Sequence, residues 1–303
     1  MQRHPPWAHS GENVRSNPSF DRNRGKLSGR SIISGYNLPG SVLIFVGLLV
    51  GSCTPAPPQG MVRVPEGKFV MGTDEVDPEN TALKLGVVKP WFDDEHPAHT
   101  VNLPVFFIDR FEVTNEQYEK FVRSTGHPAP RSWKDGTIPP GEERLPVDMV
   151  TFDDADAYCR WTGKRLPTEE EWEKAARGTD GRTYPWGNRF DPGRANVGGA
   201  HPNRLPVGSF PKGASPYGAE DLIGNVWEWT DSWYRPYPGN RYQSPNFERS
   251  VRVLRGNSWS PIGHYPPEVQ GTLVEHHSTA TFRLFAPPDA AIDDVGFRCA
   301  RSP

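Results

Sequence analysis

The chain has 303 residues, with 34 lysines and arginines against 37 aspartates and glutamates, a formal charge of −3 and three cysteines. This balance excludes a general nucleic-acid binder, whose binding face would be basic, and the cysteine count excludes a disulfide-rich miniprotein. The 30 glycines and 33 prolines, about a fifth of the chain, together with ten tryptophans predict a compact, loop-rich fold with little regular structure.

Residues 1–52 differ from the rest and are predicted to be a signal or leader segment. Six basic side chains precede the apolar run SVLIFVGLLVGS at 41–52, which is shorter than the roughly 20 residues that a membrane-spanning helix needs. The run leads into Cys53, and small residues before a cysteine resemble the lipobox of bacterial lipoproteins. The resemblance implies cleavage before Cys53 and lipidation of this cysteine. An ordinary cleaved signal and an uncleaved anchor are the alternatives.

Cleavage at this position predicts an acidic protein outside the cytoplasm, in the periplasm or on the cell surface. Its contact with the lipid membrane would be through Cys53. Residues 53–60 are rich in proline and predict an extended tether, because proline fixes φ and stiffens a linker. The globular domain is predicted to occupy residues 61–303.

Three helices are predicted from capping motifs and apolar periodicity. The first covers about 114–125, opens on a capping box at Thr114 and ends at Gly126. The second begins near Thr151, turns Cys159 inward and stops at Gly163. The third opens with a capping box at 167–171 and runs to Gly178. All three apolar faces predict ordinary core packing.

Beyond residue 178 the helical signals largely disappear. Short strands are predicted, such as 251–254 and 295–300, separated by turns rich in glycine, proline and asparagine. The aromatic residues of this half either fill the core of a fold poor in regular elements or line a groove for a peptide or sugar.

Nine motifs, in this order, resemble the formylglycine-generating (sulfatase-modifying factor) family and span most of residues 61–302. They are GKFVMG at 67–72, DEHP at 94–97, EVTN at 112–115, GKRLPTEEEWE at 163–173, YPWGN at 184–188, PVGSF at 206–210, GNVWEW at 224–229, RGNSW at 255–259 and GFRC at 296–299. The resemblance implies an α+β fold of the C-type-lectin-like kind, with low regular secondary structure.

The same resemblance implies that the family's named reaction is absent. Formylglycine-generating enzymes use copper held by two thiolates that follow the motif corresponding to RGNSW at 255–259. A soft Cu(I) ion needs such sulfur ligands. The two corresponding positions are Pro261 and Pro266 here, and Asn257 replaces a glycine of the motif. Proline cannot bind copper or attack a disulfide, so no copper and no catalytic residue are predicted.

The remaining cysteines, Cys159 and Cys299, match positions that secreted members of the family join by a disulfide. Such a bond persists outside the cytoplasm. Two separate buried thiols are the alternative. Under either reading, neither is a catalytic nucleophile.

The resemblance also implies a structural calcium ion in the segment 221–228. Its ligands would be the side chains of Asp221 and Glu228 and the backbone carbonyls of Gly224 and Val226, since calcium takes several hard oxygen ligands. The alternative for Glu228 is that it faces the other way in its strand and pairs with a basic side chain. A second family calcium site near Asn196 lacks its expected acid and is not predicted.

A possible groove is predicted around the segment that follows the tryptophan motif. Imidazoles there could hold zinc, copper or iron, although their spacing matches no standard metal motif and loop histidines are usually solvated. The residues assigned to this groove are Ser258, Trp259, Ser260, His264, His276, His277 and Arg283.

Two functions remain. The first is a lipid-anchored, non-catalytic binding or accessory subunit that contacts a protein partner in the cell envelope. The second is a metal-dependent oxidoreductase of the wider family, acting on a substrate other than a sulfatase cysteine, with the metal held by His264, His276 or His277.

Overall fold

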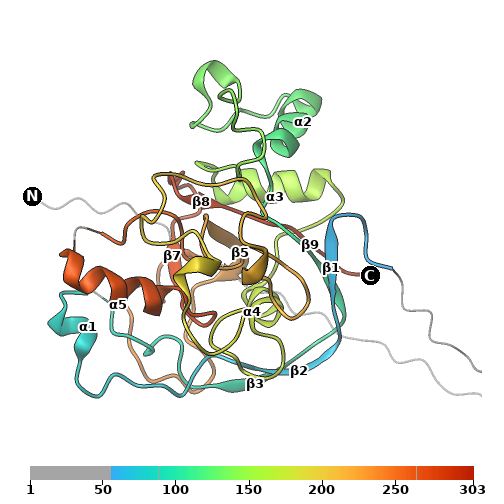
Figure 1. Ribbon diagram of the computed structural model, residues 1–303. Helices are drawn as coiled ribbons and strands as arrows, with labels where there is room; N and C mark the ends of the chain where they lie inside the picture. The colour runs from blue at the N-terminus through green and yellow to red at the C-terminus, as the bar shows by residue number, and fades with distance from the viewer. Residues whose placement is uncertain (1–55, 88, 264) are drawn as a thin grey trace, which may run out of the picture. The chain divides into compact units, whose positions relative to one another are not determined.

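Three small β-sheets and five α-helices, joined by long loops, form the part of the chain that the computed structural model describes, residues 56–87, 89–263 and 265–303 (Figure 1). The predicted α+β fold of low regular content is therefore confirmed. The predicted signal segment 1–52, the predicted lipidation residue Cys53 and His264 lie outside the described residues.

The strands are short, and each sheet joins distant parts of the sequence. One sheet has the order β1-β4-β9, the second pairs β2 with β3, and the third has the order β7-β6-β5-β8, in which β5 and β8 are parallel. The strands are β1 (Met61–Val64), β2 (Gly67–Met71), β3 (His99–Leu103), β4 (Phe106–Asp109), β5 (Trp227–Trp233), β6 (Arg252–Arg255), β7 (Leu284–Ala286), β8 (Val295–Gly296) and β9 (Ala300–Arg301).

The three predicted helices are confirmed, and each begins after the threonine expected to cap it. In all three a capping box is formed: the threonine hydroxyl accepts from the third helical N–H, and that residue's side chain accepts from the threonine N–H. The helices are α1 (Thr81–Lys84), α2 (Asn115–Thr125), α3 (Phe152–Trp161), α4 (Glu169–Arg177) and α5 (Pro267–His277).

Helix α5 contradicts the expectation that helical signals end near residue 178. It lacks a side-chain cap and contains Gly271, so the usual starting pattern is missing. The signals that it does carry are Pro267 at the first helical position, Glu268 in the first turn and two histidines in the last turn. These favour a helix, but weakly.

The strand predicted at 295–300 is also wrong, because the structure divides it between two sheets. β8 pairs with β5, whereas β9 pairs with β4. Between them, Arg298 turns into the core and Cys299 forms the predicted disulfide with Cys159, with an S–S distance of 2.01 Å. Both cysteines are fully buried in the main apolar cluster, which also contains Tyr158 and Phe297.

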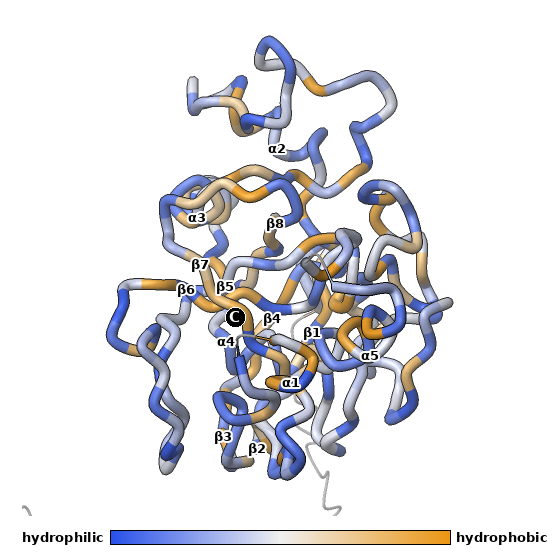
Figure 2. Tube along the Cα trace, turned by 90° about the vertical axis from the view of Figure 1, so that its left-hand side faces the viewer, coloured by the Kyte–Doolittle hydropathy of each residue, from blue (hydrophilic) through white to orange (hydrophobic). Residues whose placement is uncertain are grey.

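Apolar stretches of the trace gather around β5 and β6 (Figure 2). Apart from the main cluster, a smaller one joins α1 to α5 through Ala82, Trp91 and Leu273. Figure 1 shows these two helices side by side. Among the described residues, no helix combines the length and apolar character that crossing a membrane requires.

Candidate functional site

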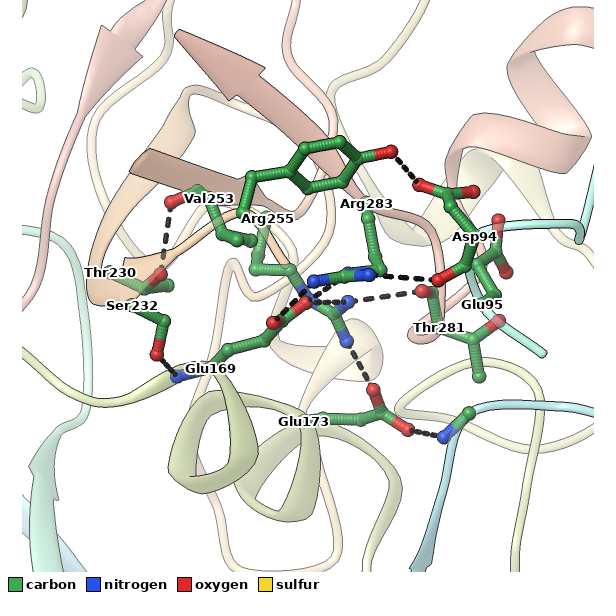
Figure 3. Close-up of polar contacts among 12 residues, drawn as sticks. Asp94, Glu95, Glu169, Glu173, Thr230, Ser232, Val253, Arg255, Thr281 and Arg283 are labelled. Atoms are coloured by element: carbon green, nitrogen blue, oxygen red, sulfur yellow. Dashed lines mark hydrogen bonds and ion pairs between the residues drawn. The ribbon is translucent and has the colours of Figure 1, made fainter. Parts of the chain in front are cut away.

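A buried network of ion pairs lies where α4, β6 and the segment before β7 meet (Figure 3). Helix α4 supplies two carboxylates, Glu169 and Glu173, which are four residues apart and therefore on one face. Arg255 from β6 contacts both, with Nη1 3.1 Å from Glu169 Oε1 and Nη2 2.5 Å from Glu173 Oε2. None of the three side chains is more than 4% exposed.

Arg283 completes this network from the other side. Its Nε and Nη2 donate to the two oxygens of Glu169 at 2.7 and 3.0 Å, and its Nη1 donates to the carbonyl of Asp94. Arg283 is only 1% exposed. Its guanidinium is therefore committed to structural contacts, and Arg283 also lines a cavity of about 710 Å³ together with Glu169 and Tyr237.

Of the predicted groove residues that follow Arg255, Ser258 is buried, whereas Trp259 and Ser260 are partly buried. The Ser258 hydroxyl donates to Asp294 Oδ2 at 2.6 Å, and Ser258 is 2% exposed. The backbone N–H of Trp259 donates to the carbonyl of Asn225, and its backbone carbonyl accepts from the N–H of Gly199. The backbone N–H of Ser260 donates to the Ser258 hydroxyl. None of these three lines a described cavity that also contains the predicted histidines. The structure thus does not bring the described residues of the predicted groove into one cavity.

The two described histidines of this set are packed among aromatic rings. His276 stacks on Trp91 with a centroid distance of 4.6 Å, and His277 stacks on Phe282 at 4.2 Å. Burial lowers the pKa of His276 to about 2 and that of His277 to about 3, and the charge of Lys89 acts in the same direction. Both imidazoles are therefore neutral at physiological pH.

His277 does line a cavity, which lies beside α5 and measures about 350 Å³. Its wall is mainly apolar and rich in aromatic rings, and it lies next to the ion-pair network through Lys89 and Asp94. Lys89 Nζ is 2.8 Å from Asp94 Oδ1 and 3.9 Å from Glu95 Oε1. Burial raises the pKa of the fully buried Glu95 carboxyl to about 7. The residues that line the cavity are Val87, Lys89, Trp91, Tyr234, Tyr242, Ser244, Pro245, Asn246, Ile262, Tyr265, Leu273, His277, Phe282, Leu284 and Phe285.

The described residues do not offer the pair of thiolates that the family's copper site requires. Cys159 and Cys299 are joined to each other, so neither offers a thiolate. Pro266 immediately precedes α5, and Pro261 packs on Gly199, where an added Cβ would lie 2.9 Å from the proline ring. Within 56–87, 89–263 and 265–303, no group of three or more histidine, cysteine, aspartate or glutamate side chains is arranged to hold a metal ion.

The predicted calcium ligands fit only in part. Both carboxylate oxygens of Glu228 are occupied: Arg298 donates to them at 2.7 and 2.8 Å, and the Trp172 indole donates at 2.8 Å. Glu228 therefore adopts the alternative role, pairing with a base. Asp221 accepts from the N–H of Gly208 through one oxygen.

Sequence reasoning missed Glu112, which the structure places in the same acidic environment as Asp221. Glu112 is 1% exposed, and neither of its carboxylate oxygens has a hydrogen-bond partner. Burial and then the charge of Asp221 raise the pKa of Glu112. Burial also raises the pKa of Asp221, to about 6.

The ion-pair carboxylates Glu169 and Glu173 were likewise missed. Their sequence signal is an excess of acid on the face of α4 that also carries Trp172, Ala175 and Ala176. A buried carboxylate needs a partner, so such a face indicates arginines elsewhere in the chain. The sequence alone does not say which arginines these are.

Comparison with known proteins gives the family. The family model of the sulfatase-modifying factor enzyme 1-like domain matches residues 49–303. The chain is 36% identical to inactive C-alpha-formylglycine-generating enzyme 2 of Mus musculus, over 80% of this chain and 85% of that protein. It is 37% identical to hercynine oxygenase of Mycolicibacterium smegmatis, over 76% of this chain but only 61% of the length of that enzyme.

A solved structure agrees with this assignment. PvdO from Pseudomonas aeruginosa superposes with a TM-score of 0.59 at 26% identity, covering 80% of this chain and 94% of PvdO. The matched family domain includes both cysteines of the disulfide and the whole ion-pair network. The chain therefore belongs to the sulfatase-modifying factor (FGE-sulfatase) family.

Proposed function

We propose that this protein is a non-catalytic binding or accessory subunit of a membrane-associated complex, anchored outside the cytoplasm through Cys53. The observation that carries the proposal is the use of the cysteines. Two form the disulfide, the third lies in the lipobox-like segment, and prolines occupy the two positions where the family places its copper ligands. The identity to a mouse relative named as inactive supports the same proposal.

The mass of the intact mature protein tests the anchoring. We expect a chain that begins at Cys53 and carries lipid, because the apolar run before it has the length of a signal-peptide core. Reduction of the denatured protein should add two protons, one for each sulfur of the disulfide. A Cys53→Ser variant should lose the lipid and its membrane retention. An unlipidated wild-type chain would contradict the anchor.

Oxygen uptake tests the lack of oxidase activity. With Cu(I) and a cysteine-containing sulfatase peptide, we expect no oxygen consumption above that of free copper, because prolines replace both thiolates. A formylglycine-generating enzyme with both cysteines, assayed in parallel, is the positive control. Stoichiometric copper binding accompanied by turnover would refute the proposal.

A metal-dependent oxidoreductase is the second candidate, favoured by the 37% identity to hercynine oxygenase. Neutral imidazoles such as those of His276 and His277 are the form that binds metals. Metal analysis of the purified protein, compared with single alanine variants at residues 264, 276 and 277, separates the candidates. A stoichiometric metal that is lost in one of these variants would favour the oxidoreductase.

For calcium, we propose that Asp221 and Glu112 hold the ion, rather than Glu228. Two buried carboxyls without a basic partner of their own must share protons or bind a cation, since an isolated buried charge is costly. We expect CaCl₂ to raise the Tm of the wild-type protein more than MgCl₂ does, and Glu112→Gln to abolish this difference. Equal Tm values in the two salts would overturn the proposal.

A further inference from the structure

The cavity beside α5 has the size and wall of a ligand site. A volume of about 350 Å³ falls within the range of small-molecule pockets. Three tyrosines, two phenylalanines and one tryptophan, from separate parts of the chain, contribute to its wall. They are Trp91, Tyr234, Tyr242, Tyr265, Phe282 and Phe285.

The charged groups at this wall already have partners. The Lys89 ammonium contacts Asp94 at 2.8 Å, donates to the carbonyl of Arg283 at 2.8 Å, and lies over the Phe282 ring at 4.1 Å from its centroid. The Tyr234 hydroxyl donates to the other oxygen of Asp94 at 2.7 Å. Both the Lys89 ammonium and the Asp94 carboxylate are therefore already paired, and neither is free to pair with a charged ligand.

This arrangement disfavours a charged ligand of either sign. Aromatic rings attract cations, but here the Lys89 ammonium already covers the face of Phe282 and would repel a second cation. An anion would have to displace Asp94, which is fully buried, from Lys89. An uncharged ring pays neither penalty and gains stacking and apolar contact.

Part of the wall is accessible enough to adapt to a ligand. Tyr265, Tyr242 and Phe285 are each only partly buried. The Tyr265 hydroxyl donates to the carbonyl of Gly86 at 3.2 Å. Its ring therefore lies against the segment that follows α1.

We propose that this cavity binds one flat, uncharged ring compound, held by the rings of Tyr265, Trp91 and Phe285. The site deepens the binding role proposed above and rests on it. The ligand class is set by the paired state of Lys89 and Asp94 and by the aromatic wall.

Three probes that share one ring and differ in charge test the ligand class. The full-length, detergent-solubilised protein is titrated by calorimetry with indole, tryptamine and indole-3-acetate. Indole should bind with saturation, and both charged compounds should bind at least about tenfold more weakly, because each must lose its hydration beside a satisfied ion pair. Tighter binding of indole-3-acetate or tryptamine, or no saturable binding of any probe, overturns the proposal.

Variants of Tyr265 test the location. Tyr265→Ala should weaken indole binding about tenfold through loss of a stacking partner, whereas Tyr265→Phe keeps the ring and should stay within about twofold. Trp161→Ala is the matched control, because Trp161 is 43% exposed and does not line the cavity. Wild-type affinity in folded Tyr265→Ala overturns the location. If that variant does not fold, Phe285→Leu replaces it under the same criterion.

This test is independent of the oxidase and metal assays. Oxygen uptake, or a stoichiometric histidine-bound metal measured before the titrations, would refute the non-catalytic role whether or not indole binds. Because His277 lines the cavity, the titrations use metal-free protein. Loss of probe binding in a protein that shows neither activity would refute the ligand site alone.

Discussion

Replacing Arg298 with methionine should lower the free energy of unfolding by about 3–5 kcal/mol, as expected for removal of one partner from a buried ion pair. Arg298 is fully buried and makes two hydrogen bonds to Glu228. It also donates to the carbonyls of Asp109, Arg110 and Glu220. The methionine would leave the Glu228 carboxylate and three carbonyls without these donors.

Urea unfolding of the full chain measures this effect, and two further variants serve as controls. Lys120→Met removes the exposed pair with Glu116, whose side chains are 63% and 54% exposed, and should change the unfolding free energy by about 0.5 kcal/mol or less. The double variant Glu228→Gln/Arg298→Met should recover part of the loss, because the buried negative charge is gone and the amide oxygen still accepts from Trp172.

The double variant also separates two explanations of the stability that Arg298→Met loses. If the cost comes from the unpaired charge, the double variant is more stable than Arg298→Met alone. If it comes from the three carbonyls, the two variants are equally unstable. A loss below about 1 kcal/mol for Arg298→Met would contradict the pairing itself.

The parts of the fold that could be predicted from the sequence are those specified by neighbouring residues. Capping boxes at Thr114, Thr151 and Thr168 act within one helical turn, so three helices follow from local patterns. Helix α5 lacks a side-chain cap, and its apolar face is filled by contacts with Ala82 and Trp91, nearly 200 residues away. Only the folded chain supplies those contacts.

The strand 295–300 failed for a related reason. Its alternation of residues suits a strand, but the positions of Arg298 and Cys299 are set by partners in other elements, Glu228 and Cys159. These two contacts lie at the crossing from one sheet to another. A periodic pattern carries no information about such a crossing.

The candidate site was predictable only at individual positions, where the family resemblance or the chemistry of one residue type indicated a role. The disulfide followed from the resemblance, and the loss of the copper ligands is visible directly in Pro261 and Pro266. The aromatic cavity joins rings that lie between residues 91 and 285, and no spacing rule connects them. Two described residues of the predicted groove, Ser258 and Arg283, have separate partners, Asp294 and Glu169, and no local pattern in the sequence indicates these partners.

Removal of the disulfide should have an effect of similar size to that of Arg298→Met. Cys159 and Cys299 are 140 residues apart. In the chain-entropy model, closing so long a loop raises the free energy of the unfolded chain by about 5 kcal/mol at 25 °C, because it removes conformational entropy. Measured values are usually lower, so the Cys159→Ala/Cys299→Ala variant should lose about 2–5 kcal/mol. Alanine also avoids leaving a polar group at two fully buried positions.

Equilibrium unfolding in urea, with and without reductant, isolates the contribution of the bond. Reductant should lower the unfolding free energy of the wild-type protein toward that of the double variant, whose own value should not change. Because both sulfurs are buried, reduction must be given time at denaturant concentrations that populate the unfolded state. A wild-type protein equally stable with and without reductant, after complete reduction is verified by mass, would show that the crosslink does not stabilise the fold.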